Sequence, residues 1–448
     1  MSLKGDLLPK VSLFILCFSF INCSTNQKKY FEDEDWVSLA KKSEKYIQTA
    51  KSRSEEGVIW KQMPDSTYSK TNDALYRGSS GIVLFYLELF NTTSDSMYLN
   101  EAKLGADYLV NTIQDTIYNS KKVGLYSGLA GIGFALTEVF KTTREEKYKK
   151  AVLKTVDILD RSSKKSLTGI HWDSITDIVY GSAGIGLYLQ HVADELSSKK
   201  ADSLAILVGN GLLDHAVQED KGIRWKAFPN DSYFFDNFSH GASGIGYFLI
   251  KSYERTQDKK YLAAAIGAGD FLDSISNEKG YVPHHLPNKE ELYYLNWCNG
   301  PVGTSRFYYL LYETTKDQKW LDKITFSANH LMLEGIDYKE TSGYWNNVGK
   351  CCGATGVAEY YLWLFEITGN IEYLEFSEKM TQRIVYQSTQ EKGYMKWIHA
   401  ENRKSPDVIA AQTGLMQGSA GIGLWFLQIN SFQNQRAALI KLPDTPKP

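Results

Sequence analysis

A short glycine motif recurs along most of this chain of 448 residues. Seven Gly-x-x-Gly elements occur, and their first glycines lie 50, 53, 60, 59, 53 and 65 residues apart, at Gly78, Gly128, Gly181, Gly241, Gly300, Gly353 and Gly418. A period of this size is typical of repeated supersecondary units, each of which needs its neighbours to bury its apolar face. We therefore expect one large repeat architecture, although the length would also allow two or three average domains.

Two kinds of helix are predicted to alternate along the repeats. Each glycine element leads into an apolar segment, such as GIGFALTEVF at 131–140, which reads as a buried helix that begins at the glycines. Between these segments, apolar residues spaced three and four apart predict amphipathic outer helices. The outer helices are expected near 36–52, 97–115, 146–163, 198–218, 258–276, 318–334 and 371–389.

The connectors between the two kinds of helix repeat as well. A glycine followed by an aromatic residue precedes most glycine elements, as in Gly57-Val-Ile-Trp60 and Gly222-Ile-Arg-Trp225, and predicts short extended segments. An open solenoid is the competing architecture, but the apolar character of every inner helix favours a closed ring. The expected fold is an all-α, α/α toroid of seven helical hairpins, with a site at the end that carries the glycine elements.

Composition narrows the possible partners. Hydrophobic residues make up 43% of the chain and the formal net charge is −2. A sizeable core is expected, and nucleic acid is excluded as the main partner because no basic excess would compensate its phosphates. We expect the protein to act as a monomer.

The N-terminus is predicted to direct export. Lys4 and Lys10 precede an apolar run at residues 11–21, which is too short to span a bilayer as a helix. Residues 1–23 resemble a bacterial lipoprotein signal in which Cys23 would be lipidated, anchoring an exported protein to a membrane of the periplasm or cell envelope. An ordinary signal peptide cut elsewhere and an uncleaved anchor are the alternatives. A polar linker at 24–35, the toroid at 36–435 and a C-terminal tail at 436–448 are expected to follow.

Three cysteines lie outside this leader, and all three stand one or two positions before the first glycine of an element. The fifth element reads Trp297-Cys298-Asn299-Gly300 and the sixth reads Cys351-Cys352-Gly353. Equivalent positions in adjacent repeats should meet in space, and converging thiolates suit a tetrahedral Zn²⁺ with one position open, as in catalytic sites. Buried free thiols, or a disulfide between Cys298 and either partner, remain alternatives.

Two further polar residues fall near the same register. His240 directly precedes the fourth glycine element, and Asp177 lies four residues before the third. Both can take part in proton transfer, so they are the candidate catalytic residues. His240 could equally be a hydrogen-bonded structural residue, and Asp177 could cap a helix.

From these motifs the chain resembles the lanthionine synthetase C-like family, the zinc-dependent cyclases of lanthipeptide biosynthesis. The likeness covers roughly residues 36–430 and rests on the seven glycine elements together with the sequences WCNG and CCG. It implies a toroid of two concentric sets of seven helices. It also implies three zinc ligands: Cys298 and Cys351 match directly, and Cys352 stands where a histidine is usual, a variant that occurs in the family.

The resemblance extends to the other candidate residues, with two departures. His240 and Asp177 match positions proposed to act as acid or base in the family. Tyr294 stands where a basic residue is common, four places before the first zinc cysteine, and Asn299 replaces an aromatic residue or a histidine. The departure at Tyr294 leaves open how a negatively charged intermediate would be stabilised.

The implied chemistry is the addition of a thiol to a dehydrated residue of a peptide. Zinc would lower the pKa of a substrate cysteine. The resulting thiolate would attack the β-carbon of dehydroalanine or dehydrobutyrine, and His240 would protonate the α-carbon. Because lanthipeptide dehydration is cytoplasmic, an exported protein would act on an exported peptide or would join a small thiol to another electrophile.

Two other classes of function are compatible with parts of the sequence. A carbohydrate-active enzyme on a helical toroid would use paired carboxylates and an aromatic cleft, for which Trp60, Trp172, Trp225, Trp345 and Trp397 are candidates. Such chemistry needs no thiolates, so the three cysteines argue against it. The second alternative is a surface-anchored binding protein whose metal site is structural or lost.

Overall fold

The computed structural model describes residues 30–66, 69–119, 122–341, 343–344 and 347–446. The expected export signal with Cys23 therefore lies outside the described residues, as does Trp345. Within the described ranges, no helix is long and apolar enough to cross a lipid bilayer.

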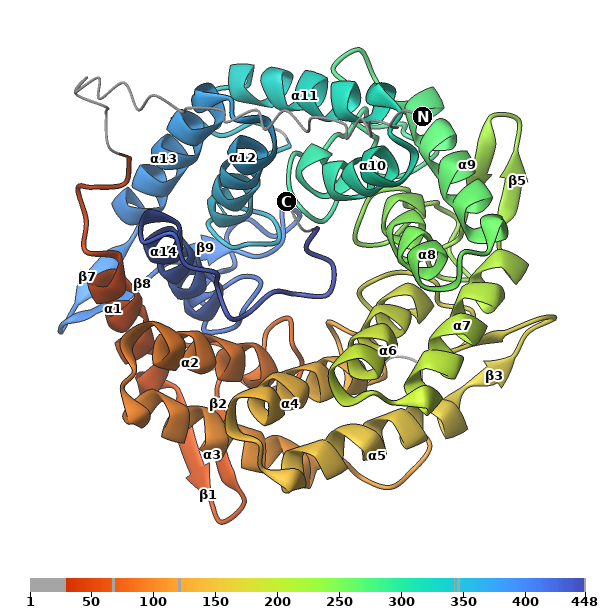
Figure 1. Cartoon of the computed structure of the whole chain (residues 1–448). Coiled ribbons are helices and arrows are strands. Elements are labelled where there is room, and N and C mark those ends of the chain that lie inside the picture. Colours follow the sequence, from red (N-terminus) through yellow and green to blue (C-terminus); the bar gives the residue numbers. More distant parts are fainter. Residues whose placement is uncertain (1–29, 67–68, 120–121, 342, 345–346, 447–448) are drawn as a thin grey trace, which may run out of the picture.

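Fourteen helices of the described chain form two concentric rings (Figure 1). The inner ring contains α2 (Ser79–Thr93), α4 (Leu129–Thr143), α6 (Ser182–Leu196), α8 (Ala242–Thr256), α10 (Pro301–Thr315), α12 (Ala354–Thr368) and α14 (Ser419–Gln433). The outer ring contains α1 (Trp36–Thr49), α3 (Ser96–Thr112), α5 (Glu146–Ser162), α7 (Lys199–Asp214), α9 (Lys259–Ile275), α11 (Gln318–Leu333) and α13 (Ile371–Tyr386). The prediction of an all-α, α/α toroid is confirmed. Each outer helix begins close to its predicted start and ends slightly before its predicted end.

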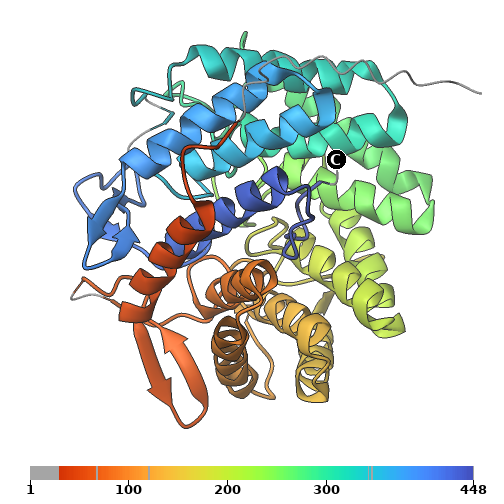
Figure 2. The ribbon, with the colours of Figure 1, turned by 60° about the vertical axis from the view of Figure 1, so that its left-hand side comes forward.

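The tight helical hairpins run from an inner helix to the next outer helix. After α2, for example, Ser94 adopts a left-handed conformation with φ 57°, and the side chain of Asp95 then caps α3 by accepting a hydrogen bond from the N–H of Met97. The first outer helix, α1, has no inner helix before it and packs against α14, the last (Figure 2). The two ends of the repeat region thus form the seventh hairpin and close the ring.

The longer connectors run from outer to inner helices, and four of them contain the predicted extended segments. These are antiparallel hairpins at the outer rim: β1 (Lys51–Ser54) with β2 (Gly57–Trp60), β3 (Lys164–Lys165) with β4 (Ile170–His171), β5 (Val217–Glu219) with β6 (Gly222–Arg224), and β7 (Thr389–Glu391) with β8 (Tyr394–Lys396) (Figure 1). The seventh connector alone among the described ones adds a second hairpin, β9 (Ile398–Ala400) with β10 (Ile409–Ala411).

The tryptophans of these connectors are structural. Trp172, Trp225 and Trp397 are buried, and each donates its indole N–H to a carbonyl near the end of the preceding outer helix, that of Leu159, Leu212 and Ile384 respectively. These bonds help to satisfy carbonyl groups in the last turn of each outer helix. Trp60 is also buried and stacks on Tyr86. None of these four rings is therefore available to line a carbohydrate cleft.

Backbone hydrogen bonds join the seven glycine elements into a ring. They connect the minus-two residues, which we define as those two positions before each first glycine: Tyr76, Tyr126, Val179, Ser239, Cys298, Cys351 and Met416. The N–H of one minus-two residue donates to the carbonyl of the next in the pairs Tyr76–Tyr126, Tyr126–Val179, Ser239–Cys298, Cys298–Cys351, Cys351–Met416 and Met416–Tyr76, at 2.8 to 3.4 Å. Among the described residues, only the step from Val179 to Ser239 lacks such a bond.

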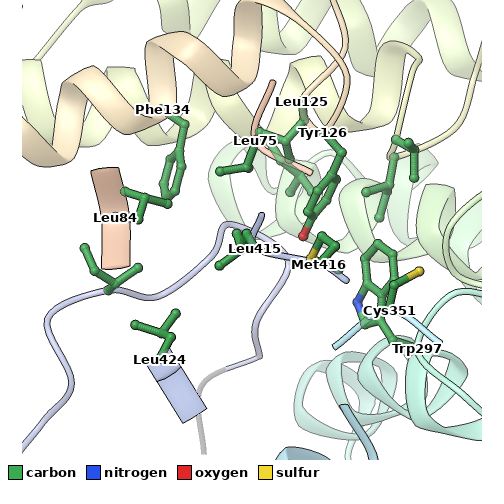
Figure 3. Close-up of a cluster of buried hydrophobic side chains, with 14 of the residues drawn as sticks. Leu75, Leu84, Leu125, Tyr126, Phe134, Trp297, Cys351, Leu415, Met416 and Leu424 are labelled. Atoms are coloured by element: carbon green, nitrogen blue, oxygen red, sulfur yellow. The ribbon is translucent and has the colours of Figure 1, made fainter. Parts of the chain in front are cut away.

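The glycines are required because the chain passes close to itself at this ring. A Cβ atom on Gly184 would overlap the carbonyl oxygen of Ile178, six residues earlier, and one on Gly421 would overlap that of Leu415. Residues such as Leu75, Leu125 and Leu415 form an apolar layer directly beneath the ring (Figure 3). The repeated glycines therefore serve close packing of each helix start against its own connector.

The C-terminal tail enters the centre of the toroid (Figure 1). Asp444 is fully buried there, and its carboxylate accepts hydrogen bonds from the hydroxyl of Tyr126 at 2.8 Å and the indole N–H of Trp297 at 3.1 Å. Arg306 of α10 donates to the backbone carbonyl of Asp444 at 3.0 Å. The tail thus contacts the residue that precedes Cys298 from below the ring.

We predict that Gly184→Ala destabilises the fold by about 1–3 kcal/mol, because the added methyl group forces the backbone of Ile178 to move. Gly267→Ala is the matched control, since Gly267 lies within α9 and its nearest neighbour would be 3.4 Å from the new Cβ. Chemical unfolding of both variants measures the difference. Equal stability of Gly184→Ala and the wild type would contradict this account of the ring.

Candidate functional site

The end of the toroid that carries the glycine elements contains a pocket of about 1020 Å³. We define the minus-one residues as those directly before each first glycine. Minus-two and minus-one residues from all seven repeats line the pocket: Tyr76, Arg77, Tyr126, Ser127, Val179, Tyr180, Ser239, His240, Cys298, Asn299, Cys351, Cys352 and Gln417. The site is therefore built at the positions where the repeats meet.

The three predicted metal ligands come together in this pocket. The Sγ atom of Cys352 lies 3.3 Å from that of Cys351 and 3.4 Å from that of Cys298, and all three sulfurs lie within 4.8 Å of one another. All three side chains are buried and free. A disulfide needs about 2.05 Å between sulfurs, so the alternative of a disulfide is not what the structure contains.

Burial makes it costly for all three sulfurs to be charged without a cation. Hydrogen bonds from Cys351 and Cys352 lower the pKa of Cys298 well below its usual range, whereas burial raises the pKa of Cys351. The hydrogen bond with Cys298 is likewise the main cause that raises the pKa of Cys352. The metal-free cluster therefore favours one thiolate that two thiols stabilise, because further buried negative charges would repel each other.

This donor set fits zinc. Thiolates bound at about 2.3 Å to a tetrahedral ion stand roughly 3.8 Å apart, close to the sulfur separations found here. A divalent cation would offset the charge of all three thiolates, and metal binding would release their protons. The cluster supplies three ligands beside an open pocket, which leaves a fourth position for a substrate.

Polar neighbours hold individual sulfurs. Asn299 donates hydrogen bonds to Sγ of Cys298 from its side chain and from its backbone N–H, and both lower the pKa of Cys298. Gln417 donates its side-chain N–H to Sγ of Cys352 at 3.5 Å and to the hydroxyl of Tyr76 at 2.8 Å. Sequence reasoning missed Tyr76 and Gln417, although both stand in the minus-two or minus-one register that singled out the cysteines.

His240 and Asp177 form a hydrogen-bonded pair in the same pocket region. Nδ1–H of His240 donates to Oδ2 of Asp177 at 2.6 Å, while Oδ1 of Asp177 accepts from the N–H groups of Tyr180 and Gly181 at 2.6 and 2.7 Å. Asp177 thus holds the start of α6 with one oxygen and the imidazole with the other. With Nδ1 protonated, Nε2 of His240 is the nitrogen that can exchange a proton with a substrate.

The position of this pair coincides with the break in the backbone ring. Asp177 belongs to the third repeat and His240 to the fourth. The minus-two residues of these two repeats, Val179 and Ser239, lack the backbone hydrogen bond that joins the minus-two residues of other adjacent repeats in the described structure. The N–H of Ser239 donates to the carbonyl of Cys298 at 2.9 Å, as in the regular steps of the ring. One backbone bond therefore ties the residue before His240 to the first cysteine.

Aromatic residues fix the imidazole and extend the wall of the pocket. The ring of His240 is parallel to that of Tyr180 within 10°, and Phe235 lies edge-on to both His240 and His284. His284 in turn contacts Tyr294 with ring centroids 4.6 Å apart. Burial, followed by the neighbouring His285, lowers the pKa of His284 to about 3, so this histidine is neutral at pH 7.

Comparisons with known proteins were made on sequence and on fold. The family described as "Lanthionine synthetase C-like protein" matches residues 69–442, most of the chain, and no curated protein matches. Nisin cyclase has 18% sequence identity and a TM-score of 0.61, over 89% of this chain and 95% of that one. A protein of Listeria innocua has 14% identity and a TM-score of 0.50, over 90% and 99% of the two chains.

Carbohydrate enzymes also occur among the structures with a related fold. An α-mannanase of glycoside hydrolase family 76 from Bacteroides thetaiotaomicron has 10% identity and a TM-score of 0.48, over 90% of this chain and 98% of that one. Identities this low concern the fold alone. The match of the family to residues 69–442 goes further, and on that ground this chain belongs to the lanthionine synthetase C-like family.

Proposed function

We propose that the protein is a zinc-dependent enzyme that adds a cysteine thiolate to dehydroalanine or dehydrobutyrine in a peptide, forming a thioether, or that it carries out a related thiol addition. The observation that carries this proposal is the cluster of three free, buried sulfurs of Cys298, Cys351 and Cys352 in an open pocket. Zinc, when bound by these residues, would lower the pKa of an incoming thiol so that it reacts as a thiolate at neutral pH.

The roles of His240 and Asp177 follow from the proton balance of the addition. A thiol loses its proton as its sulfur bonds to the β-carbon, and the α-carbon later gains one, so the overall reaction consumes no proton. Nε2 of His240 can hold a proton and deliver it to the α-carbon. Asp177 fixes the proton on Nδ1 and would stabilise the imidazolium between the two steps.

We predict one zinc ion per chain in the purified protein, and loss of that zinc in Cys298→Ala. Val179→Ala is the matched control, because Val179 occupies the same minus-two position two repeats earlier and carries no sulfur. Elemental analysis measures the metal. A wild type without zinc, or a Cys298→Ala variant that keeps it, would rule out this metal centre.

We expect the zinc-loaded protein to consume the free thiol of a dehydrated, cysteine-containing peptide, which alkylation followed by mass spectrometry detects. His240→Ala should slow this reaction by roughly 10²–10⁴-fold without loss of zinc, since it removes the proton donor. His330→Ala is the control, because His330 is a half-buried residue of the outer helix α11 and does not line the sulfur pocket. Unchanged rates in His240→Ala would refute the proton-transfer role.

We also propose that the protein acts outside the cytoplasm, anchored through lipidated Cys23. The support is the leader sequence, with its basic start, short apolar run and terminal cysteine. Cells grown with a radioactive fatty acid should label the wild type and not Cys23→Ala. Equal labelling of both would exclude this mode of anchoring.

A further inference from the structure

The second hairpin of the seventh connector carries a loop that lines the sulfur pocket. Its residues Glu401, Asn402, Arg403, Ser405 and Val408 all face the pocket. The β9–β10 pairing forms the base of this loop, where the side-chain amide of Asn347 donates to the carbonyl of Ala400 at 3.0 Å. The loop is therefore attached to the sixth repeat, directly beside the cysteines.

An ion pair anchors the same loop to the first repeat. Nη2 of Arg77 lies 2.7 Å from Oε1 of Glu401, so the loop is held from two sides of the pocket. The pair also offsets the charge of Arg77. By contrast, none of the ion pairs formed between described residues involves Arg403, which leaves its positive charge available in the pocket.

Arg403 reaches the fifth repeat at Tyr294, four residues before Cys298. Its guanidinium lies close enough to the phenol of Tyr294 to lower the pKa of that phenol. Burial raises the pKa of Tyr294, the guanidinium of Arg403 opposes that rise, and charge on the sulfurs of Cys298 and Cys352 adds to it. Arg403, the phenol and the sulfurs are therefore close enough to act on one substrate.

Thiol addition needs positive charge near the sulfur site. As the C–S bond forms at the β-carbon, the electron pair of the C=C bond moves onto the carbonyl oxygen of the dehydrated residue. Protonation of the α-carbon then restores the carbonyl group, so atoms and electrons balance without an oxidant or reductant. An enzyme that holds the oxygen anion with a fixed cationic donor lowers this barrier.

We infer that Arg403, together with the phenol of Tyr294, binds the carbonyl oxygen of the reacting residue while it carries negative charge. This inference rests on the proposed function and adds a catalytic group to it. A guanidinium suits the role because it stays charged and offers several N–H donors in one plane, so it can bond Tyr294 and a substrate oxygen together. His284 contacts Tyr294 and, through Phe235, His240, and the side chains of His240, His284, Tyr294 and Arg403 all line the same pocket.

The kinetic test compares Arg403→Gln and Arg403→Lys with Lys404→Gln. Lys404 is the exposed neighbour of Arg403, so its substitution removes the same charge from the same loop. We expect Arg403→Gln to reduce kcat for thiol addition roughly 10²-fold with zinc content unchanged, Arg403→Lys to restore part of it, and Lys404→Gln to have no effect. An active wild type with an equally active Arg403→Gln would overturn the inference and leave the proposed function standing.

A wild type that catalyses no thiol addition would reject the proposed function. In that case a binding experiment still tests the inference about Arg403. The protein loaded with Co²⁺ is titrated with 3-mercaptopropionate and with 2-mercaptoethanol, and thiolate binding is followed by the sulfur-to-metal absorption band. We expect the wild type and Lys404→Gln to prefer the thiol that carries an oxygen anion, and Arg403→Gln to lose this preference. Equal preference in Arg403→Gln and the wild type, or failure of the wild type to bind metal, overturns the inference.

Discussion

The ring of backbone hydrogen bonds between minus-two residues is the constraint on which the rest of the structure depends. Each bond links one repeat to the next, and the bond from Met416 to Tyr76 links the last repeat to the first. To reach these bonds, each connector passes so close to its own helix start that no room is left for a Cβ atom, as at Gly184 and Gly421. The glycine pattern in the sequence therefore marks the positions where the repeats meet.

The candidate site uses the same positions that hold the ring together. The backbone of Cys298 and Cys351 takes part in the ring, so their side chains are placed by bonds that are independent of side-chain identity. Tyrosine and methionine occupy equivalent positions elsewhere and form the same backbone bonds. Where the backbone bond is missing, between Val179 and Ser239, the side chains of Asp177 and His240 join the two repeats instead. Chemistry could therefore vary between repeats at little cost to the fold.

The sequence predicts what is periodic and does not predict what lies outside the period. Apolar spacing located the outer helices, and the register before the glycines brought Cys298, Cys351 and Cys352 together correctly. The same register contained Gln417, but a neutral side chain carries no chemical signal until its contact with Cys352 is seen. Arg403 lies in a loop and Asp444 in the C-terminal tail, and neither segment is repeated along the chain. Only tertiary contacts therefore place Arg403 in the pocket and Asp444 in the centre of the toroid.

The filled centre of the toroid explains how an open pocket can hold buried sulfurs. Beneath the cysteines, the apolar layer and the C-terminal tail fill the centre of the toroid, with Trp297 and Met416 next to Cys351 (Figure 3). Lys350 is a buried charged residue close to these groups, and Glu359 offsets its charge through an ion pair of 2.7 Å. On the opposite side, the three cysteines border the open pocket. In the proposed reaction, a thiolate that enters the pocket would exchange part of its hydration for fixed donors, and the lower local polarity would strengthen the electrostatic contacts in the pocket.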